Sequence, residues 1–159
     1  MALAAEEGGY LPDTCTLMHW GSVIVGADPK DAAFREWIWS SLETGLLQIP
    51  AVIAEELQDN SPSLREVLAK QKVEIMKLDH AIESQAKDLL ANLKAQGRIL
   101  GKRCVDVEDL ELILTAKRYG MTVITQEAQG RGRCNIPTVC QELGVPYMNS
   151  AQLRAKLGL

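Results

Sequence analysis

Apolar positions recur along the chain with two periods in turn, one typical of strands and one typical of helices. Short apolar runs bounded by turn-forming residues predict five strands, at residues 10–14, 46–49, 73–78, 121–125 and 146–148. Apolar residues three and four apart predict the helices between them, at residues 31–44, 51–58, 61–71, 80–96, 107–119, 136–143 and 150–157. Gly45, Gly120 and Gly144 end three of these helices.

This order of elements predicts an α/β fold, a three-layer α/β/α sandwich around a central parallel sheet of four or five strands. The chain has 159 residues, 47% hydrophobic and 24% charged, which is the ordinary mixture of one globular domain rather than of disorder. We expect residues 1–9 to be a flexible N-terminal extension and residues 10–159 to form the domain. Since ligands bind beyond the carboxyl ends of the strands in such sheets, residues that follow strands are candidates for a site.

Charge and cysteine content narrow the expected setting. The formal net charge is −4, whereas a protein that binds nucleic acid by general electrostatics is usually basic, so such binding needs a local basic patch or metal ions. The four cysteines form no CxxC pair, which favours reduced thiols that act as small buried apolar groups. No signal peptide and no apolar run of membrane-spanning length is visible. We therefore expect a soluble cytoplasmic protein that makes no membrane contact.

Glu56 falls on the buried side of its predicted helix. Three apolar residues define the inward arc at about 100° per residue, namely Val52, Ile53 and Leu57. Glu56 lies inside this arc, whereas its neighbour Glu55 lies outside it. The alternative is that Glu56 occupies the margin of the arc and pairs with a lysine or arginine.

Asp109 shows the same pattern in a second helix. The buried face of this helix is marked by Leu112, Ile113, Ala116 and Tyr119. Asp109 lies within their arc, and Asp106 lies nearer its edge. The alternative is that Asp106 is the N-cap and that Asp109 only occupies the first turn, where the helix dipole favours negative charge.

Two further carboxylates follow predicted strands. Asp13 closes the first strand, although aspartates at strand ends often accept hydrogen bonds from nearby backbone N–H groups. Glu127 follows the strand of residues 121–125, in a segment that has the composition of an exposed loop. A buried carboxylate is costly without a partner, and Mg²⁺ and Mn²⁺ favour oxygen ligands. Four such groups on neighbouring elements therefore predict a divalent-metal site.

The chain resembles the PIN domain family, in particular VapC-like toxins and related PIN-like bacterial proteins. The resemblance runs from about residue 10 to the C-terminal end. It is carried by Leu11-Pro-Asp-Thr-Cys15, Ile53-Ala-Glu-Glu-Leu57, Val107-Glu-Asp-Leu-Glu-Leu-Ile-Leu-Thr-Ala116, Val123-Ile-Thr-Gln-Glu127 and Asn135-Ile-Pro-Thr-Val-Cys-Gln-Glu-Leu-Gly144.

The resemblance implies a PIN-like fold with a catalytic quartet that holds Mg²⁺ or Mn²⁺. Its members here are Asp13, Glu56, Asp109 and Glu127. Thr14 and Thr125 border the implied site. The chain departs from the family pattern at two positions, since many members have Asn or Ser in place of Cys15 and Asp in place of Glu127. The longer Glu127 leaves the second metal position open.

The resemblance also implies a function, a metal-dependent endoribonuclease that cleaves single-stranded RNA and serves as the toxin of a toxin–antitoxin pair. A cognate antitoxin and a homodimer are the partners it implies, and Asp13 and Asp109 are the expected core ligands. The candidates for holding the RNA backbone are Lys102, Arg103, Arg131 and Arg133. Their alternative reading is a solvated basic loop.

Other readings of the sequence are poorer. Cys15 and His19 resemble a thiol–base pair, yet nothing supplies a third, orienting group. A phosphatase of the haloacid type needs a second aspartate two residues after Asp13, where Cys15 stands. The tryptophans suit a core or an interface better than a base-stacking surface. The main rival is a catalytically silent PIN-like module that binds RNA or a protein partner.

Overall fold

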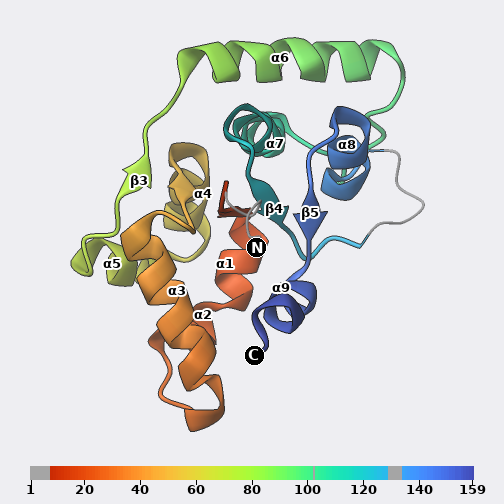
Figure 1. The fold of residues 1–159 in the computed structure, drawn as a ribbon. Coiled ribbons are helices and arrows are strands. Elements are labelled where there is room, and N and C mark those ends of the chain that lie inside the picture. Colours follow the sequence, from red (N-terminus) through yellow and green to blue (C-terminus); the bar gives the residue numbers. More distant parts are fainter. Residues whose placement is uncertain (1–7, 102, 129–133) are drawn as a thin grey trace.

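The computed structural model describes residues 8–101, 103–128 and 134–159. Within these residues one or more helices follow each strand, and each strand is only two or three residues long (Figure 1). In chain order the elements are β1 (Tyr10–Pro12), α1 (Thr14–His19), α2 (Gly21–Val25), the 3-10 turn η1 (Pro29–Asp31), α3 (Ala32–Thr44), β2 (Ile49–Pro50), α4 (Ala51–Asn60), α5 (Pro62–Lys70), β3 (Ile75–Met76), α6 (His80–Ala95), α7 (Val107–Tyr119), β4 (Thr122–Ile124), α8 (Ile136–Leu143), β5 (Tyr147–Met148) and α9 (Ser150–Leu157).

The described strands pair in parallel. Strand β4 lies between β1 and β5 in a three-stranded sheet, and β2 pairs with β3. The two sets meet at Tyr10, whose N–H donates to the Leu46 carbonyl at 2.7 Å and whose carbonyl accepts from the Gln48 N–H at 3.0 Å. The α/β class and the parallel sheet are confirmed, and the five strands divide into a sheet of three and a pair.

Two short helices, α1 and α2, occupy a segment for which the hydrophobic pattern predicts no helix. They have six and five residues, too few to show a helical period. The segment also contains several β-branched residues, which lower helix propensity. Helix α1 forms because Asp13 caps it, with the side chain accepting a hydrogen bond from the Thr16 N–H. Asp13 therefore ends β1 and begins α1 at once.

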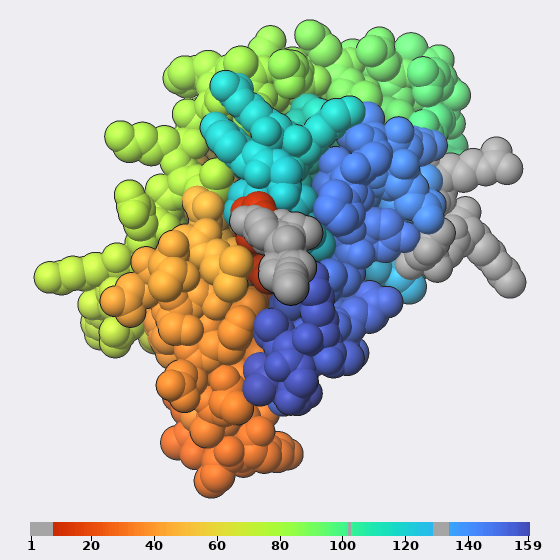
Figure 2. Space-filling model, viewed as in Figure 1, coloured from red at the N-terminus to blue at the C-terminus, as the bar shows by residue number. Residues whose placement is uncertain are grey.

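The aromatic residues build the part of the core below the sheet. Trp20 is buried, and its ring lies 5.4 Å from that of Phe34 in an edge-to-face arrangement. Its indole N–H donates to the Ser150 hydroxyl at 2.8 Å, which ties the first helices to α9. The Arg154 guanidinium covers Phe34 from the other side at 4.7 Å, and Figure 2 shows α9 lying against α3. The expectation that tryptophan serves the core is confirmed for Trp20.

The cysteines correct one expectation from the sequence. Cys104 and Cys134 form a disulfide, so the expectation that the thiols are unpaired is wrong for these two residues. Cys140 is a buried free thiol, and Cys15 is an exposed one. Spacing along the chain does not reveal this pairing, because it depends on how the segments before α7 and α8 meet in space.

The folded unit includes the two residues before β1. Gly9 is buried, and its carbonyl accepts a hydrogen bond from the Thr122 N–H at 2.9 Å. Its φ of +91° and the closeness of the Leu46 carbonyl to the position of a Cβ both require glycine. Residues 1–7, most of the expected flexible extension, lie outside the described residues. Within the described residues, no helix has the length and apolarity needed to cross a membrane.

Candidate active site

Asp13 is held from two sides where β1 ends. One carboxylate oxygen accepts the Thr16 N–H at 2.8 Å, and the other accepts the Thr125 hydroxyl at 2.6 Å. The residue is buried, with 5% of its surface exposed. Thr125 follows β4, so this contact joins the carboxyl ends of two paired strands. Asp13 therefore caps α1, as the alternative reading expects, and also faces the strand end at which a site is expected.

Glu56 is partly buried on α4, while Glu55 is exposed, so the predicted orientation of this helix is confirmed. The Glu56 carboxylate accepts the Thr14 hydroxyl at 3.1 Å. Burial raises its pKa to about 7, against the lowering effect of that hydrogen bond, and the nearby carboxylates of Asp106, Glu108 and Asp13 raise it further. Among the described residues no lysine or arginine pairs with it.

Asp109 satisfies both readings of the sequence at once. It forms a capping box with Asp106, in which the Asp109 N–H donates to the Asp106 carboxylate at 2.9 Å and the Asp106 N–H donates back at 3.1 Å. It is also partly buried. Burial, followed by the charge of Asp106, raises its pKa to about 8, and Glu127 adds to this shift. Asp109 therefore caps the helix and also lies close enough to the other carboxylates for their charges to raise its pKa.

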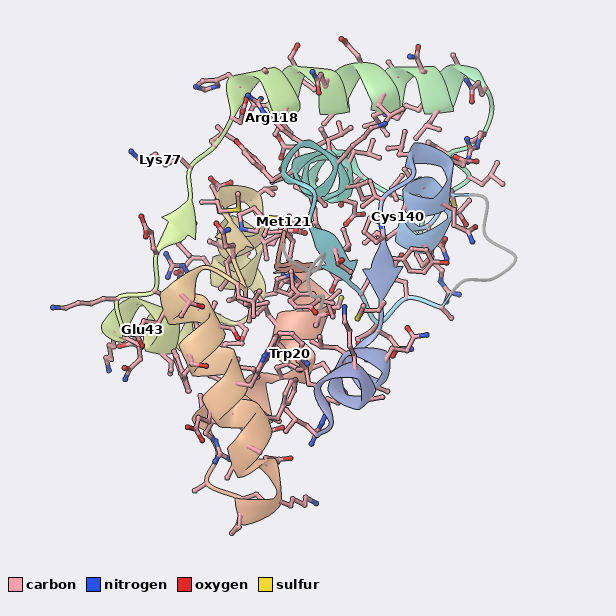
Figure 3. The ribbon with its side chains drawn as sticks, viewed as in Figure 1. Trp20, Glu43, Lys77, Arg118, Met121 and Cys140 are labelled. Atoms are coloured by element: carbon pink, nitrogen blue, oxygen red, sulfur yellow. A yellow bond between two sulfur atoms is a disulfide. The ribbon has the colours of Figure 1, made fainter. Side chains whose placement is uncertain are left out.

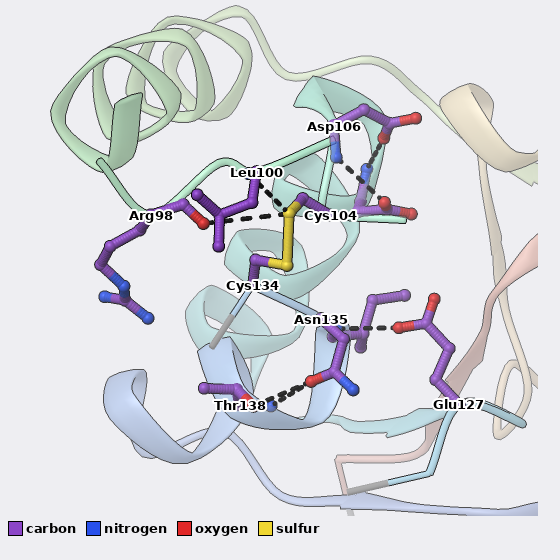
Figure 4. The surroundings of a disulfide bond; sticks show 10 residues. Arg98, Leu100, Cys104, Asp106, Glu127, Cys134, Asn135 and Thr138 are labelled. Atoms are coloured by element: carbon purple, nitrogen blue, oxygen red, sulfur yellow. Dashed lines mark hydrogen bonds between the residues drawn. A yellow bond between two sulfur atoms is a disulfide. The ribbon is translucent and has the colours of Figure 1, made fainter. Parts of the chain in front are cut away.

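Glu127 reaches from the end of β4 to the start of α8 (Figure 4). Its carboxylate accepts the Ile136 N–H at 2.9 Å, and its own N–H donates to the Thr125 hydroxyl at 3.2 Å. Burial of the carboxyl group raises its pKa, Asp13 and Asp106 raise it further, and the Ile136 hydrogen bond lowers it. The residue as a whole is exposed, as the loop reading expects.

The four carboxylates share one neighbourhood, and Cys15 lies within it. After burial, the charges of Asp13, Glu127, Asp109 and Glu56 all raise the pKa of the Cys15 thiol. The ion pairs of the described residues include none of the four. We call these four residues the acidic cluster. Their charges influence one another, but the side chains are not arranged as a preformed metal site. In the described residues no three His, Cys, Asp or Glu side chains lie closely enough together to hold a metal ion.

Two acidic residues beside the cluster were not among the predicted site residues. The charge of Asp106 raises the pKa values of Glu56, Asp109 and Glu127, and the charge of Glu108 raises that of Glu56. Both lie in the first turn of α7 or just before it, so their nearness to Asp109 in the chain is the signal that could have found them. Their charge adds to that of the cluster.

The predicted RNA-binding residues are placed only in part. Arg103 is exposed, in the segment between α6 and α7. The other three, Lys102, Arg131 and Arg133, lie outside the described residues. The basic patch therefore stays a prediction.

The disulfide lies beside the acidic cluster and joins the two segments that lead into it. Cys104 precedes Asp106, the N-cap of α7, and Cys134 precedes Asn135, the N-cap of α8 (Figure 4). The Asn135 side chain accepts the Thr138 N–H at 3.1 Å and so fixes the start of α8, where Glu127 is bound. This covalent link braces two of the helix ends that position the cluster.

Comparisons with known proteins give a family and a fold. The family described as "Domain of unknown function (DUF4411)" matches residues 10–158. VapBC2 from Rickettsia felis, solved with a DNA fragment from its promoter, is 15% identical over 88% of this chain and 97% of its own, with a TM-score of 0.53. FitAB bound to an IR36 DNA fragment is 18% identical over 88% of this chain and 94% of its own, with a TM-score of 0.52. No curated protein matches. At such identities the likeness shows the fold alone, which is the PIN fold.

Proposed function

Because this chain belongs to the DUF4411 family and has the PIN fold, we propose that it is a divalent-metal-dependent endoribonuclease that cleaves single-stranded RNA. The observation that carries the proposal is the acidic cluster, four carboxylates that repel one another and have no cationic partner among the described residues. Mutual repulsion of this kind is relieved when a divalent cation binds. The cluster lies at the carboxyl ends of β1 and β4, where α/β proteins place their sites.

The donor set fits Mg²⁺ or Mn²⁺ in its chemistry. All four groups offer carboxylate oxygens, and Asp13, Asp109, Glu56 and Glu127 would hold the ion. Asp109 and Glu127 each accept a backbone N–H, from Asp106 and Ile136, with one carboxylate oxygen, so the other oxygen of each can face an ion. A bound ion of this kind lowers the pKa of its water and stabilises charge that develops on a phosphate.

The chain's own residues divide the remaining tasks. Asp13 is fixed by two hydrogen bonds and presents its carboxylate in one orientation, as a core ligand requires. Thr125 orients Asp13, and Thr14 orients Glu56 in the same way. A pKa of about 7 suits Glu56 to accept a proton from an attacking water near neutral pH.

The proposal includes a role as the toxin of a toxin–antitoxin pair. The neighbours in fold, VapBC2 and FitAB, are two-component assemblies, which supports a cognate antitoxin partner for this chain. The basic residues Lys102, Arg103, Arg131 and Arg133 are proposed to hold the RNA backbone, which the net charge of −4 otherwise disfavours. A homodimer completes the proposal, together with a cytoplasmic location, where the Cys104–Cys134 disulfide would be an exception to the reduced state of most thiols.

A second candidate is a catalytically silent PIN-like module that binds RNA or a protein partner. It is favoured by one observation, that each carboxylate of the acidic cluster already accepts a hydrogen bond from the chain itself. In this reading those hydrogen bonds satisfy the carboxylates without an ion, and the cluster serves only to hold neighbouring segments of the chain together.

Calorimetric titration with Mn²⁺, followed by a cleavage assay on single-stranded RNA, separates the two candidates. The wild-type chain should bind Mn²⁺ and cleave, and Asp109→Asn should lose both properties while it keeps the fold. Asp59→Asn is a matched control, since Asp59 is exposed on α4 and outside the cluster. Cleavage retained by Asp109→Asn would refute its assignment, and a wild-type chain that binds no Mn²⁺ would establish the silent module.

A further inference from the structure

A cavity of about 650 Å³ lies on the side of α7 away from the acidic cluster. It is bounded by the β2–β3 pair and by the first residues of α4 and α6. None of the four cluster carboxylates lines it. Figure 3 labels two lining residues, Met121 beside α7 and Lys77 on the segment between β3 and α6. Its volume falls in the range of cavities that take small molecules, roughly 300–1,000 Å³.

Glu111 lines this cavity and is buried, with 7% of its surface exposed. Among the described residues none donates a hydrogen bond to its carboxylate or forms an ion pair with it. The nearby Thr115 hydroxyl donates instead to the Glu111 backbone carbonyl, at 2.6 Å. Residues two apart on a helix point about 200° apart, so Glu111 and Asp109 face opposite sides of α7. The carboxylate therefore belongs to the cavity and not to the acidic cluster.

The charges around Glu111 favour a cation. After burial, the charges of the Glu83, Glu108 and Glu55 carboxylates all raise the pKa of Glu111. Lys87 lowers this pKa, but it is exposed and forms no ion pair with Glu111. Asp79 at the rim is already satisfied, because Arg118 pairs with it at 2.7 Å. The oxygens of the Glu111 carboxylate are not among the buried, unpartnered side-chain atoms of the described residues, so they open into the cavity, where a ligand that carries a cation can pair with them.

The rest of the lining mixes polar residues, among them Gln48, Lys77 and Asp79, with a group of apolar side chains. Val52, Met76, Ile82 and Met121 contribute side chains from four different elements or element ends. We propose that this cavity binds a small organic amine, with its ammonium group on the Glu111 carboxylate and its apolar body against these four residues. A few convergent polar groups in an apolar lining are the usual composition of a small-molecule site. The proposal is independent of the nuclease proposal, since the two sites share no residue.

Binding of phenethylammonium, observed through isotope-labelled methionine methyl groups by NMR, tests the proposal. Met76 and Met121 line the cavity, whereas Met18 and Met148 do not and serve as internal controls. The first two signals should shift saturably and the last two should stay in place. Phenethyl alcohol has the same apolar body without the charge and should bind more weakly, about ten- to hundredfold. Equal binding of the alcohol, or no saturable shift at Met76 and Met121, would overturn the proposal.

Glu111→Gln removes the charge at nearly constant volume and should weaken phenethylammonium binding by about ten- to hundredfold. Glu36→Gln makes the same change of charge on the exposed side of α3, outside the cavity, and should leave binding unchanged. If both variants bind like the wild-type chain, Glu111 is not the recognition group and the proposal fails. The comparison of amine with alcohol on the wild-type chain needs no variant, so it stands even if Glu111→Gln folds poorly.

Discussion

Helix α7 carries two carboxylates, Asp109 and Glu111, that point to opposite sides of the helix and have different neighbours. Asp109 accepts a hydrogen bond from the Asp106 N–H and lies among the charges of the acidic cluster. Glu111 as a whole exposes only 7% of its surface, and no described residue donates to its carboxylate. A carboxylate that caps a helix has a role in folding whatever else it does. A buried carboxylate without a donor has no such role, and so it points more directly to a partner outside the chain.

The largest expected effect is on the cluster side, from Asp13→Asn. Asparagine also caps helices, so α1 should remain while a charged oxygen ligand is lost. Metal-dependent RNA cleavage should fall by more than the roughly 10–100-fold expected on loss of an outer partner. Thr125→Val removes only the hydroxyl that orients Asp13, so it should fall within that 10–100-fold range. Initial cleavage rates at saturating Mn²⁺ measure the effect of each variant. Equal losses in Asp13→Asn and Thr125→Val would contradict the assignment of Asp13 as a ligand and Thr125 as the residue that orients it.

The disulfide braces the cluster side alone, so its removal should separate the two sides. Cys104→Ser should lower the free energy of unfolding in oxidising buffer by about 3–4 kcal/mol, given the loop of 30 residues that the bond closes. Denaturant titration measures this, with the free exposed Cys15→Ser as control. The NMR signals of Met76 and Met121 should stay in place in Cys104→Ser. A loss of stability in Cys15→Ser of equal size would show that the disulfide is not the cause.

Two carboxylates that line the same cavity should respond to removal with opposite signs. Glu111→Leu replaces an unpartnered buried carboxylate by an apolar side chain and should raise the free energy of unfolding by about 1 kcal/mol. Asp79→Ala should lower it, because Asp79 accepts the Ala81 and Ile82 N–H groups that begin α6 and also pairs with Arg118. Denaturant titration of both variants gives the signs. Destabilisation by Glu111→Leu would mean that Glu111 has a partner within the fold.

The cluster should also make the stability of the fold depend on pH. The pKa of Glu56 is raised from 4.5 to about 7 and that of Asp109 from 3.8 to about 8, so the folded state holds protons that the unfolded state releases. The contribution of these two groups to the free energy of unfolding should therefore be full below about pH 4 and be lost as pH rises through 7 to 8. Denaturant titrations at several pH values, with and without Mn²⁺, measure this slope. An ion that holds the carboxylates charged should reverse it, and a slope that Mn²⁺ leaves unchanged would contradict the metal site.

Local pattern predicts the cluster side of α7 better than the cavity side. The helical period gives the bounds of α7, Val107–Tyr119, and places Asp109 on the face of Leu112, Ile113 and Ala116, which are buried. The same period places Tyr119 on the buried face, and this prediction is wrong, because Tyr119 is exposed at the end of the helix. Glu111 falls off that face and so looks solvent-exposed in the sequence. The structure buries it because α6 packs against α7 (Figure 1), which no period within α7 reveals.

The same limit explains the other differences from expectation. The Cys104–Cys134 bond depends on two segments that meet only in the fold, and spacing along the chain says nothing of it. Helices α1 and α2 are too short for a period to show. By contrast, Asp13 and Glu56 could be placed from the sequence, because a strand end and a helical arc are local features. Tertiary packing decides which of these strand ends, helix faces and cysteines come together, and the local sequence does not show this.

The most direct test of the central claim is a crystal structure of the chain soaked in Mn²⁺, with the ion located by its anomalous signal. The account predicts an ion that contacts the carboxylates of Asp13 and Asp109. A crystal that holds no ion at this position, with the hydrogen bonds of Asp109 and Glu127 as they stand here, would contradict it.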